Sequence, residues 1–313
     1  MSRPLLRPLV VDDLPACADV FYAALDELYS RNRQPPLPRN PEGMARMFGH
    51  LLATDPERCW VAADSERVVA FGIAQRREST WFLSFLFVRP EVQSVGVGRE
   101  LTEACMATDA QGDGANGEPS ITRAVCAEAL QPVSIGLYTS LGMMPRLPLF
   151  LTTGRPRNGP PLGAVGDLVA VPFDELAETD HSTLVRTVDG LDRAVLGYAH
   201  PQDHRFWSIT GRSGWLFRDP GTGAAVGYGY ASPTGRIGPV CVSEPRWLPA
   251  ALDHLLAAND PPDGWQITVP GPSALLPTLI AAGLRFDGGP ALYCSTSPGP
   301  GFDRYLAGNF AIL

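Results

Sequence analysis

One stretch, residues 81–106, constrains this chain more than any other. An apolar run of strand length ends at Pro90, two glycines follow at Gly96 and Gly98, and apolar residues then recur at helical spacing. The pattern predicts a strand, a tight loop and a helix. Glycines leave the backbone accessible, and a helix start offers unpaired N–H groups and the positive end of its dipole. The stretch therefore predicts an anion site, and a phosphate suits it best.

Two common phosphate loops do not fit this sequence. A Walker loop needs a lysine after its second glycine, whereas Arg99 follows Gly98 and no serine or threonine comes next. A dinucleotide loop needs a third glycine, and counting from Gly96 that position is Leu101. A purely structural turn without a ligand stays open as an alternative.

Residues 88–99, VRPEVQSVGVGR, resemble the acyl-CoA loop of the GNAT superfamily of N-acyltransferases. That loop reads Val-x-Pro and then Gln/Arg-x-x-Gly-x-Gly/Ala, and the match holds at every defined position. Residues 131–143 resemble the second signature, Asn-x-x-Ala-x-x-Leu-Tyr-x-x-x-Gly-Phe, although Gln131, Ser134 and Met143 depart from it. Two signatures in the right order make chance agreement improbable.

The resemblance implies acetyl-CoA as co-substrate. The loop would hold the pyrophosphate, and backbone groups of the preceding strand would pair with the pantetheine amides. The implied cofactor-binding residues are Leu86, Phe87, Val88, Gln93, Ser94, Val95, Gly96, Val97, Gly98 and Arg99.

Acyl transfer from a thioester to an amine needs a neutral nucleophile, a donor for the developing oxyanion and a proton for the leaving thiolate. The resemblance implies Tyr138 as the general acid, because a tyrosine at this motif position reaches the cofactor sulfur in the family. It implies the backbone N–H of Val88 as the oxyanion donor. A tyrosine that merely packs in the core is the alternative for Tyr138.

The general base is less defined. Many relatives carry a glutamate on the fourth strand, but residues 82–87 contain no carboxylate. Glu128, at the end of the predicted fifth strand, is the preferred candidate. Asp26 or Glu27 on the first predicted helix, or water alone, are the alternatives, and Ser84 could relay protons through ordered water.

The acceptor is predicted to be the amine of a small molecule. The family generally binds it between the first two helices, which here are predicted from Leu14 onward and around residues 44–52. This placement implies Tyr22, Asp26 and Tyr29 as acceptor contacts, and a solvated helix face is the alternative reading of the same residues.

Composition narrows the function classes. The chain has 313 residues and a net charge of −8, spread evenly over its two halves, so neither half offers a basic face for nucleic acid. All 25 basic residues are arginine, which excludes lysine Schiff-base chemistry and fits codon bias in a GC-rich, bacterial genome. The six cysteines are scattered, which favours reduced thiols in the cytoplasm. We find no signal peptide and no apolar run of membrane length, so we expect a soluble protein without a membrane partner. The expected oligomeric state is a monomer or a homodimer.

The second half repeats the order of predicted elements but lacks the loop, because Ser243-Glu-Pro-Arg-Trp247 stands where the glycines should fall. The expected fold is α/β (α+β mixed sheet): two tandem GNAT-like domains, each a mostly antiparallel sheet flanked by helices with a splayed central strand pair. We predict a catalytic domain over 1–153, a Pro/Gly linker over 154–166 and a degenerate domain over 167–313.

His200 and His204 share a helix face, but no third ligand is apparent, so no metal site is predicted. A non-catalytic acyl-CoA-binding or regulatory module is the alternative function.

Overall fold

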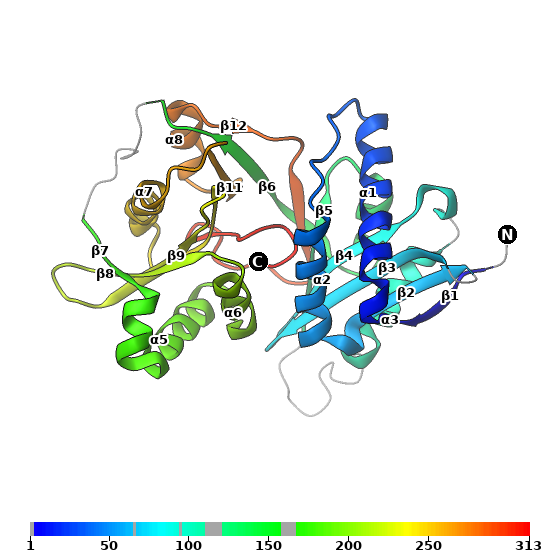
Figure 1. Cartoon of the computed structure of the whole chain (residues 1–313), viewed down its shortest axis with the longest axis horizontal. Helices are drawn as coiled ribbons and strands as arrows, with labels where there is room; N and C mark the ends of the chain where they lie inside the picture. Colours follow the sequence, from blue (N-terminus) through cyan, green and yellow to red (C-terminus); the bar gives the residue numbers. More distant parts are fainter. Residues whose placement is uncertain (1–2, 65–66, 94–95, 110–120, 158–166) are drawn as a thin grey trace. The chain divides into compact units, whose positions relative to one another are not determined.

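The computed structural model describes residues 3–64, 67–93, 96–109, 121–157 and 167–313 (Figure 1). The chain divides into two compact units. Unit 1 comprises Met1–Met144 and Cys294–Ser297, and unit 2 comprises Pro145–Tyr293 and Pro298–Leu313.

This division differs from the predicted one in Cys294–Ser297, which belong to unit 1, and in residues 145–153, which belong to unit 2. They lie in β6 (Met144–Gly154), which pairs antiparallel with β11 (Trp265–Pro270) over six residues, from Leu149 to Gly154. A long-range strand pairing therefore sets the boundary, and local composition carries no sign of it. Residues 158–166 of the predicted linker lie outside the described residues.

Unit 1 follows the predicted order of elements. Strands β1 to β4 form an antiparallel meander, and β5 pairs parallel with β4. Its elements are β1 (Leu5–Pro8), α1 (Leu14–Arg31), α2 (Pro41–Thr54), β2 (Cys59–Asp64), β3 (Arg67–Arg77), β4 (Thr80–Val88), α3 (Val97–Met106), β5 (Thr122–Glu128) and α4 (Pro132–Ser140).

The helices of unit 1 cover both faces of its sheet. Helices α1 and α2 pack on one face over an edge-to-face phenylalanine cluster, whose members are Phe21, Phe48, Phe71, Phe85 and Phe87. Helix α3 packs on the other face, where Leu101 contacts Ala62, Val69 and Ala70. A Cβ at Gly72 would lie 3.0 Å from the Cys105 sulfur, so this glycine lets α3 approach β3 closely.

The parallel pairing of β4 and β5 is short. It runs from Thr80 opposite Thr122 to Leu83 opposite Val125, although β4 continues to Val88 and β5 to Glu128. The register between β3 and β4 shifts at the same level, which leaves Ser84 as the extra residue of a β-bulge. The two strands therefore part after Leu83, as the predicted splay requires.

Unit 2 repeats the arrangement of unit 1. Strands β7 to β10 are antiparallel and β11 is parallel to β10. The further elements are β7 (Val169–Pro172), α5 (Phe173–Val195), α6 (Pro201–Ile209), β8 (Ser213–Arg218), β9 (Ala225–Ala231), β10 (Arg236–Val242), α7 (Leu248–Ala258), α8 (Leu275–Ala282), β12 (Arg285–Phe286), β13 (Ala291–Ser295) and β14 (Tyr305–Leu306). The tandem fold is thus confirmed, and α5 kinks at Asp180.

Among the helices of the described residues, none is both long enough and apolar enough to cross a bilayer. All six cysteines are free thiols.

Candidate active site

The glycine loop leads into α3 as predicted. Gly96 is the residue before the first helical turn, and its φ of +91° lies in the left-handed region that favours glycine. The side-chain amide of Gln93 donates to the Val88 carbonyl at 3.0 Å, which ties the loop to the end of β4. Ser94 and Val95 lie outside the described residues.

The register of β4 decides which backbone groups face the splay. The Arg89 N–H donates to the Val69 carbonyl, so by antiparallel alternation Val88 and Leu86 point their backbone groups away from β3. Phe87 has the opposite orientation and packs its ring 5.8 Å from that of Phe71. Leu86 and Val88 therefore offer N–H and carbonyl groups to an extended ligand beside β4, whereas Phe87 supports the core beneath it.

Gly98 stands where α3, α4 and β4 converge. A Cβ built there would lie 3.8 Å from Leu137 and Val88 and 3.9 Å from Leu86, which is ordinary contact, and no positive φ requires a glycine. Protein packing therefore does not demand glycine at this position, while a ligand lying against the first turn of α3 would. Arg99 reaches the Ser140 hydroxyl at 2.5 Å from the same turn.

We expect Gly98→Ala to raise the KM for acetyl-CoA about tenfold or more, equivalent to about 1.4 kcal/mol of lost binding. The free protein should keep its stability or gain up to about 1 kcal/mol, because alanine favours a helix over glycine. Gly96→Ala is the matched control, since its positive φ predicts a loss of about 1–2 kcal/mol in the free energy of unfolding. Denaturant unfolding and steady-state kinetics measure both, and an unchanged KM in Gly98→Ala would contradict the assignment.

Tyr138 lies in α4 with only 4% of its surface exposed. Burial, together with the nearby Cys294 thiol, holds the pKa of Tyr138 well above its usual value, so the phenol stays protonated at neutral pH. A general acid has to carry its proton in this way. Residues 294–297 join unit 1 through the Thr296 N–H, which donates to the Arg123 carbonyl at 2.9 Å. Sequence reasoning missed Cys294, and no local signal could have pointed to it.

Glu128 ends β5 beyond the point where β4 and β5 part. Burial raises the pKa of its carboxyl from 4.5 to about 7. A carboxylate tuned to neutral pH suits proton abstraction from an ammonium or amine, because efficient general bases titrate near the working pH. Ser84 stands at the β-bulge, and its buried hydroxyl has no hydrogen-bond partner among the described residues.

The three acceptor candidates lie on one face of α1 at helical spacing. The Tyr22 hydroxyl accepts the Asn40 N–H at 2.6 Å, and Asp26 pairs with Arg39 at 2.5 Å. Tyr29 is half-buried on the same helix. Tyr22 and Asp26 therefore position the loop between α1 and α2, and their contact with an acceptor stays a prediction.

In unit 2 the corresponding cofactor position is closed. Strand β14 pairs antiparallel with β10, with Leu306 opposite Val240, and Ala307 bridges to Thr268 of β11. The chain itself therefore fills the gap between the parallel strands. Residues 243–247, which replace the glycine loop, form a turn in which the Arg246 guanidinium stacks 4.8 Å from the Trp247 ring.

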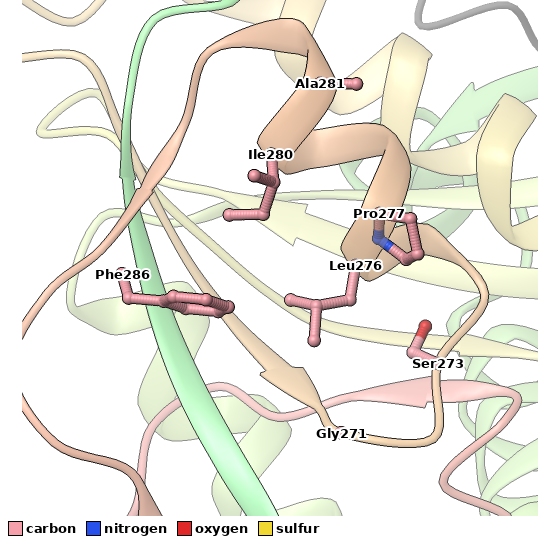
Figure 2. Close-up of a pocket in the computed structure, with 7 residues that line it drawn as sticks. All are labelled: Gly271, Ser273, Leu276, Pro277, Ile280, Ala281 and Phe286. Atoms are coloured by element: carbon pink, nitrogen blue, oxygen red, sulfur yellow. The ribbon is translucent and has the colours of Figure 1, made fainter.

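A pocket of about 550 Å³ lies elsewhere in unit 2, along α8 and β12 (Figure 2). Figure 2 shows Leu276, Ile280 and Phe286 facing it from the helix and the strand. Its lining contains no titratable side chain and none of the predicted site residues, so it offers no group for acid–base chemistry. The lining residues are Gly271, Ser273, Leu276, Pro277, Ile280, Ala281 and Phe286.

Comparisons with known proteins agree with this geometry. Residues 22–143 match the model of the Acetyltransferase (GNAT) family. Similar solved structures include a putative acetyltransferase from Pyrococcus horikoshii, with 16% identity, a TM-score of 0.73 and coverage of 99% of this chain and 95% of that one. A GCN5-related N-acetyltransferase from Sphaerobacter thermophilus shares 17% identity with a TM-score of 0.63, covering 94% of this chain and 96% of that one.

A tandem GNAT protein from the clavulanic acid biosynthesis pathway shares 17% identity with a TM-score of 0.52, covering 95% of this chain and 99% of that one. The comparison with curated proteins gave no match. The family match places residues 22–143 of unit 1 in the GNAT acetyltransferase family, and the two-unit fold of the whole chain is similar to that of a tandem GNAT structure.

Proposed function

We propose that unit 1 binds acetyl-CoA and transfers the acetyl group to the amine of a small molecule by direct attack in a ternary complex. Acyl-CoA-dependent acetyl transfer follows from the family, and the acceptor class is our proposal. One observation carries the assignment of the site: in unit 1 the gap between β4 and β5 opens beside the glycine start of α3, whereas β14 fills the equivalent gap in unit 2.

The roles follow from the chemistry of the residues. Glu128 accepts the proton that the amine loses as its nitrogen bonds to the acetyl carbon. The Val88 N–H, which points away from β3, donates to the oxyanion that forms on the carbonyl oxygen. As the carbon–sulfur bond breaks, Tyr138 gives its proton to the leaving thiolate. No covalent enzyme intermediate is needed.

The acidic character of α1 supports a cationic amine as acceptor. The buried Oε2 of Glu27 has no hydrogen-bond partner among the described residues, and Tyr22, Asp26 and Tyr29 lie on the same helix. An ammonium or amine group is the natural partner for such a carboxylate. Arg39 pairs with Asp26, and Arg31 lies 3.8 Å from Oε1 of Glu27, so Oε2 of Glu27 is the carboxylate oxygen that we expect to meet the acceptor.

A non-catalytic acyl-CoA sensor is the second candidate, favoured by the lack of a carboxylate on β4. Free-thiol release from acetyl-CoA against a panel of amines separates the two functions. Acceptor-dependent thiol release that Tyr138→Phe strongly reduces supports the enzyme. Thermal stabilisation by acetyl-CoA without thiol release for any amine would support the sensor.

We expect one acetyl-CoA per chain in isothermal titration calorimetry, because only unit 1 combines the glycine loop with an open gap. The variant carrying Gly96→Glu and Gly98→Glu should lose both binding and the thermal shift, since two carboxylates would face the pyrophosphate. A control variant with Gly221→Glu, in an exposed turn of unit 2, should bind normally. Two equivalents per chain, or a shift that survives the double substitution, would contradict the site.

A further inference from the structure

Three potential metal ligands converge inside unit 2. Asp192 of α5 places Oδ2 2.8 Å from Nε2 of His204 and 3.2 Å from Nε2 of His200, the residue before α6. All three ligand atoms lie within 4.8 Å of one another. No third ligand is apparent beside His200 and His204 in the sequence, because Asp192 reaches them only through the packing of α5 on α6.

The outer atoms of these side chains are each oriented by a second residue. The Tyr228 hydroxyl donates to Oδ1 of Asp192 at 2.5 Å, and Nδ1 of His204 lies 2.9 Å from the Tyr230 hydroxyl. Metal-binding histidines and carboxylates typically have their second polar atom fixed in this way. These contacts leave Oδ2 of Asp192 and the Nε2 atoms of His200 and His204 as the three atoms that face a common centre.

His200 shows that hydrogen bonding within the protein leaves this cluster incomplete. The side chain is fully buried, yet neither ring nitrogen makes a hydrogen bond among the described residues. Its Nδ1 lies 3.5 Å from Oδ2 of Asp203, an arrangement in which a carboxylate orients a ligating imidazole. A buried imidazole without hydrogen bonds is costly, and a metal ion at Nε2 would satisfy it.

The buried negative charge of Asp192 also favours a bound cation. Asp192 is fully buried, with 0% of its surface exposed. The Asp192 side chain contacts two imidazoles and a tyrosine hydroxyl. A buried carboxylate needs a compensating cation, which a divalent ion supplies while the imidazoles stay neutral.

We propose that unit 2 holds a zinc ion bound by Asp192 Oδ2, His200 Nε2 and His204 Nε2, with water at the fourth position. Zinc lies about 2.0–2.1 Å from such ligands, which sets tetrahedral ligand atoms about 3.3 Å apart. The 3.2 Å spacing fits this value, and the 2.8 Å spacing widens by about half an ångström. In unit 1, the helices equivalent to α5 and α6 pack over phenylalanines. In unit 2 the zinc ion would hold the two helices together in place of such an apolar cluster.

The test begins with the tag-free full chain, grown with zinc, passed through gel filtration and analysed by elemental mass spectrometry. We expect about one zinc per chain. After removal of zinc by a chelator, Co²⁺ should restore one equivalent with the visible d–d bands of a tetrahedral ion. Substoichiometric zinc together with no cobalt spectrum would overturn the proposal and leave a buried hydrogen-bond network.

Variants locate the ion. Asp192→Asn and His204→Gln keep side-chain size and should lose the metal. Asp203→Asn should weaken zinc binding about 10–100-fold, because Asp203 orients His200 without ligating the ion. His181→Gln, on the exposed surface of α5, is the control and should bind normally. Full zinc retention in His204→Gln, or loss in His181→Gln, would overturn the site. If a variant fails to fold, the wild-type zinc content and cobalt spectrum still decide.

Discussion

Glu128→Gln is expected to lower kcat for acetyl transfer about 10²–10⁴-fold, the range that a positioned general base contributes. The amide keeps the shape of the side chain and cannot accept the proton. The KM for acetyl-CoA should change little, because Glu128 ends β5 and takes no part in the glycine loop. Steady-state thiol release measures both constants, and Glu178→Gln on the surface of α5 serves as a matched control.

The pH profile makes this test specific for the base. Since burial raises the pKa of Glu128 to about 7, the carboxylate becomes available only as the pH rises through that value. The wild-type kcat/KM should therefore increase across pH 6–8 (a window of about one unit on each side of this pKa) and then level off. The kcat/KM of Glu128→Gln should not show this increase between pH 6 and pH 8. A wild-type profile that is retained in Glu128→Gln would assign the base to Asp26, Glu27 or water.

Stability should change in the opposite direction to activity. Between the usual pKa of 4.5 and the folded value of about 7, the unfolded chain has released the Glu128 proton while the folded chain retains it. The free energy of unfolding therefore falls as the pH rises through this window. Above it, Glu128→Gln should be more stable than the wild type by about 1–3 kcal/mol, since the buried charge is gone. Urea unfolding at pH 4 and pH 8 measures the difference, which should be small at pH 4 because both the folded and the unfolded chain then hold the Glu128 proton.

Tyr138→Phe should lower kcat about 10²-fold or more with the KM for acetyl-CoA nearly unchanged. Phenylalanine preserves the buried ring and removes only the hydroxyl that protonates the thiolate. Because the defect concerns the leaving group, an acyl donor with a more acidic thiol should narrow the difference between variant and wild type. Neither effect is expected if Tyr138 only packs in the core.

Tyr305→Phe is the matched control for this substitution. Tyr305 is fully buried in unit 2, and its hydroxyl has no hydrogen-bond partner among the described residues. Its loss should leave the kinetics unchanged. A tenfold decrease in kcat for both variants would point to a general effect on folding and would contradict a specific role for Tyr138.

The glycine loop shows what was predictable from the sequence. Gly96 requires a left-handed φ, and the apolar periodicities on both sides of it determine a strand and a helix from neighbouring residues alone. The meander of β1 to β4 and the repeat in unit 2 could be predicted for the same reason. Glu128 and Tyr138 entered as candidates from their motif positions, but the raised pKa of each arises from burial, which depends on the folded chain.

The sequence by itself determined the elements, their order and the loop at which an acyl-CoA is expected. Only the tertiary structure decided that β6 pairs with β11, that β14 closes the gap in unit 2, that Cys294 lies beside Tyr138 and that Asp192 meets His200 and His204. The reason is physical. Helices and turns follow from local backbone preferences, whereas these contacts join residues far apart in the chain, and their pairing depends on how the whole core packs.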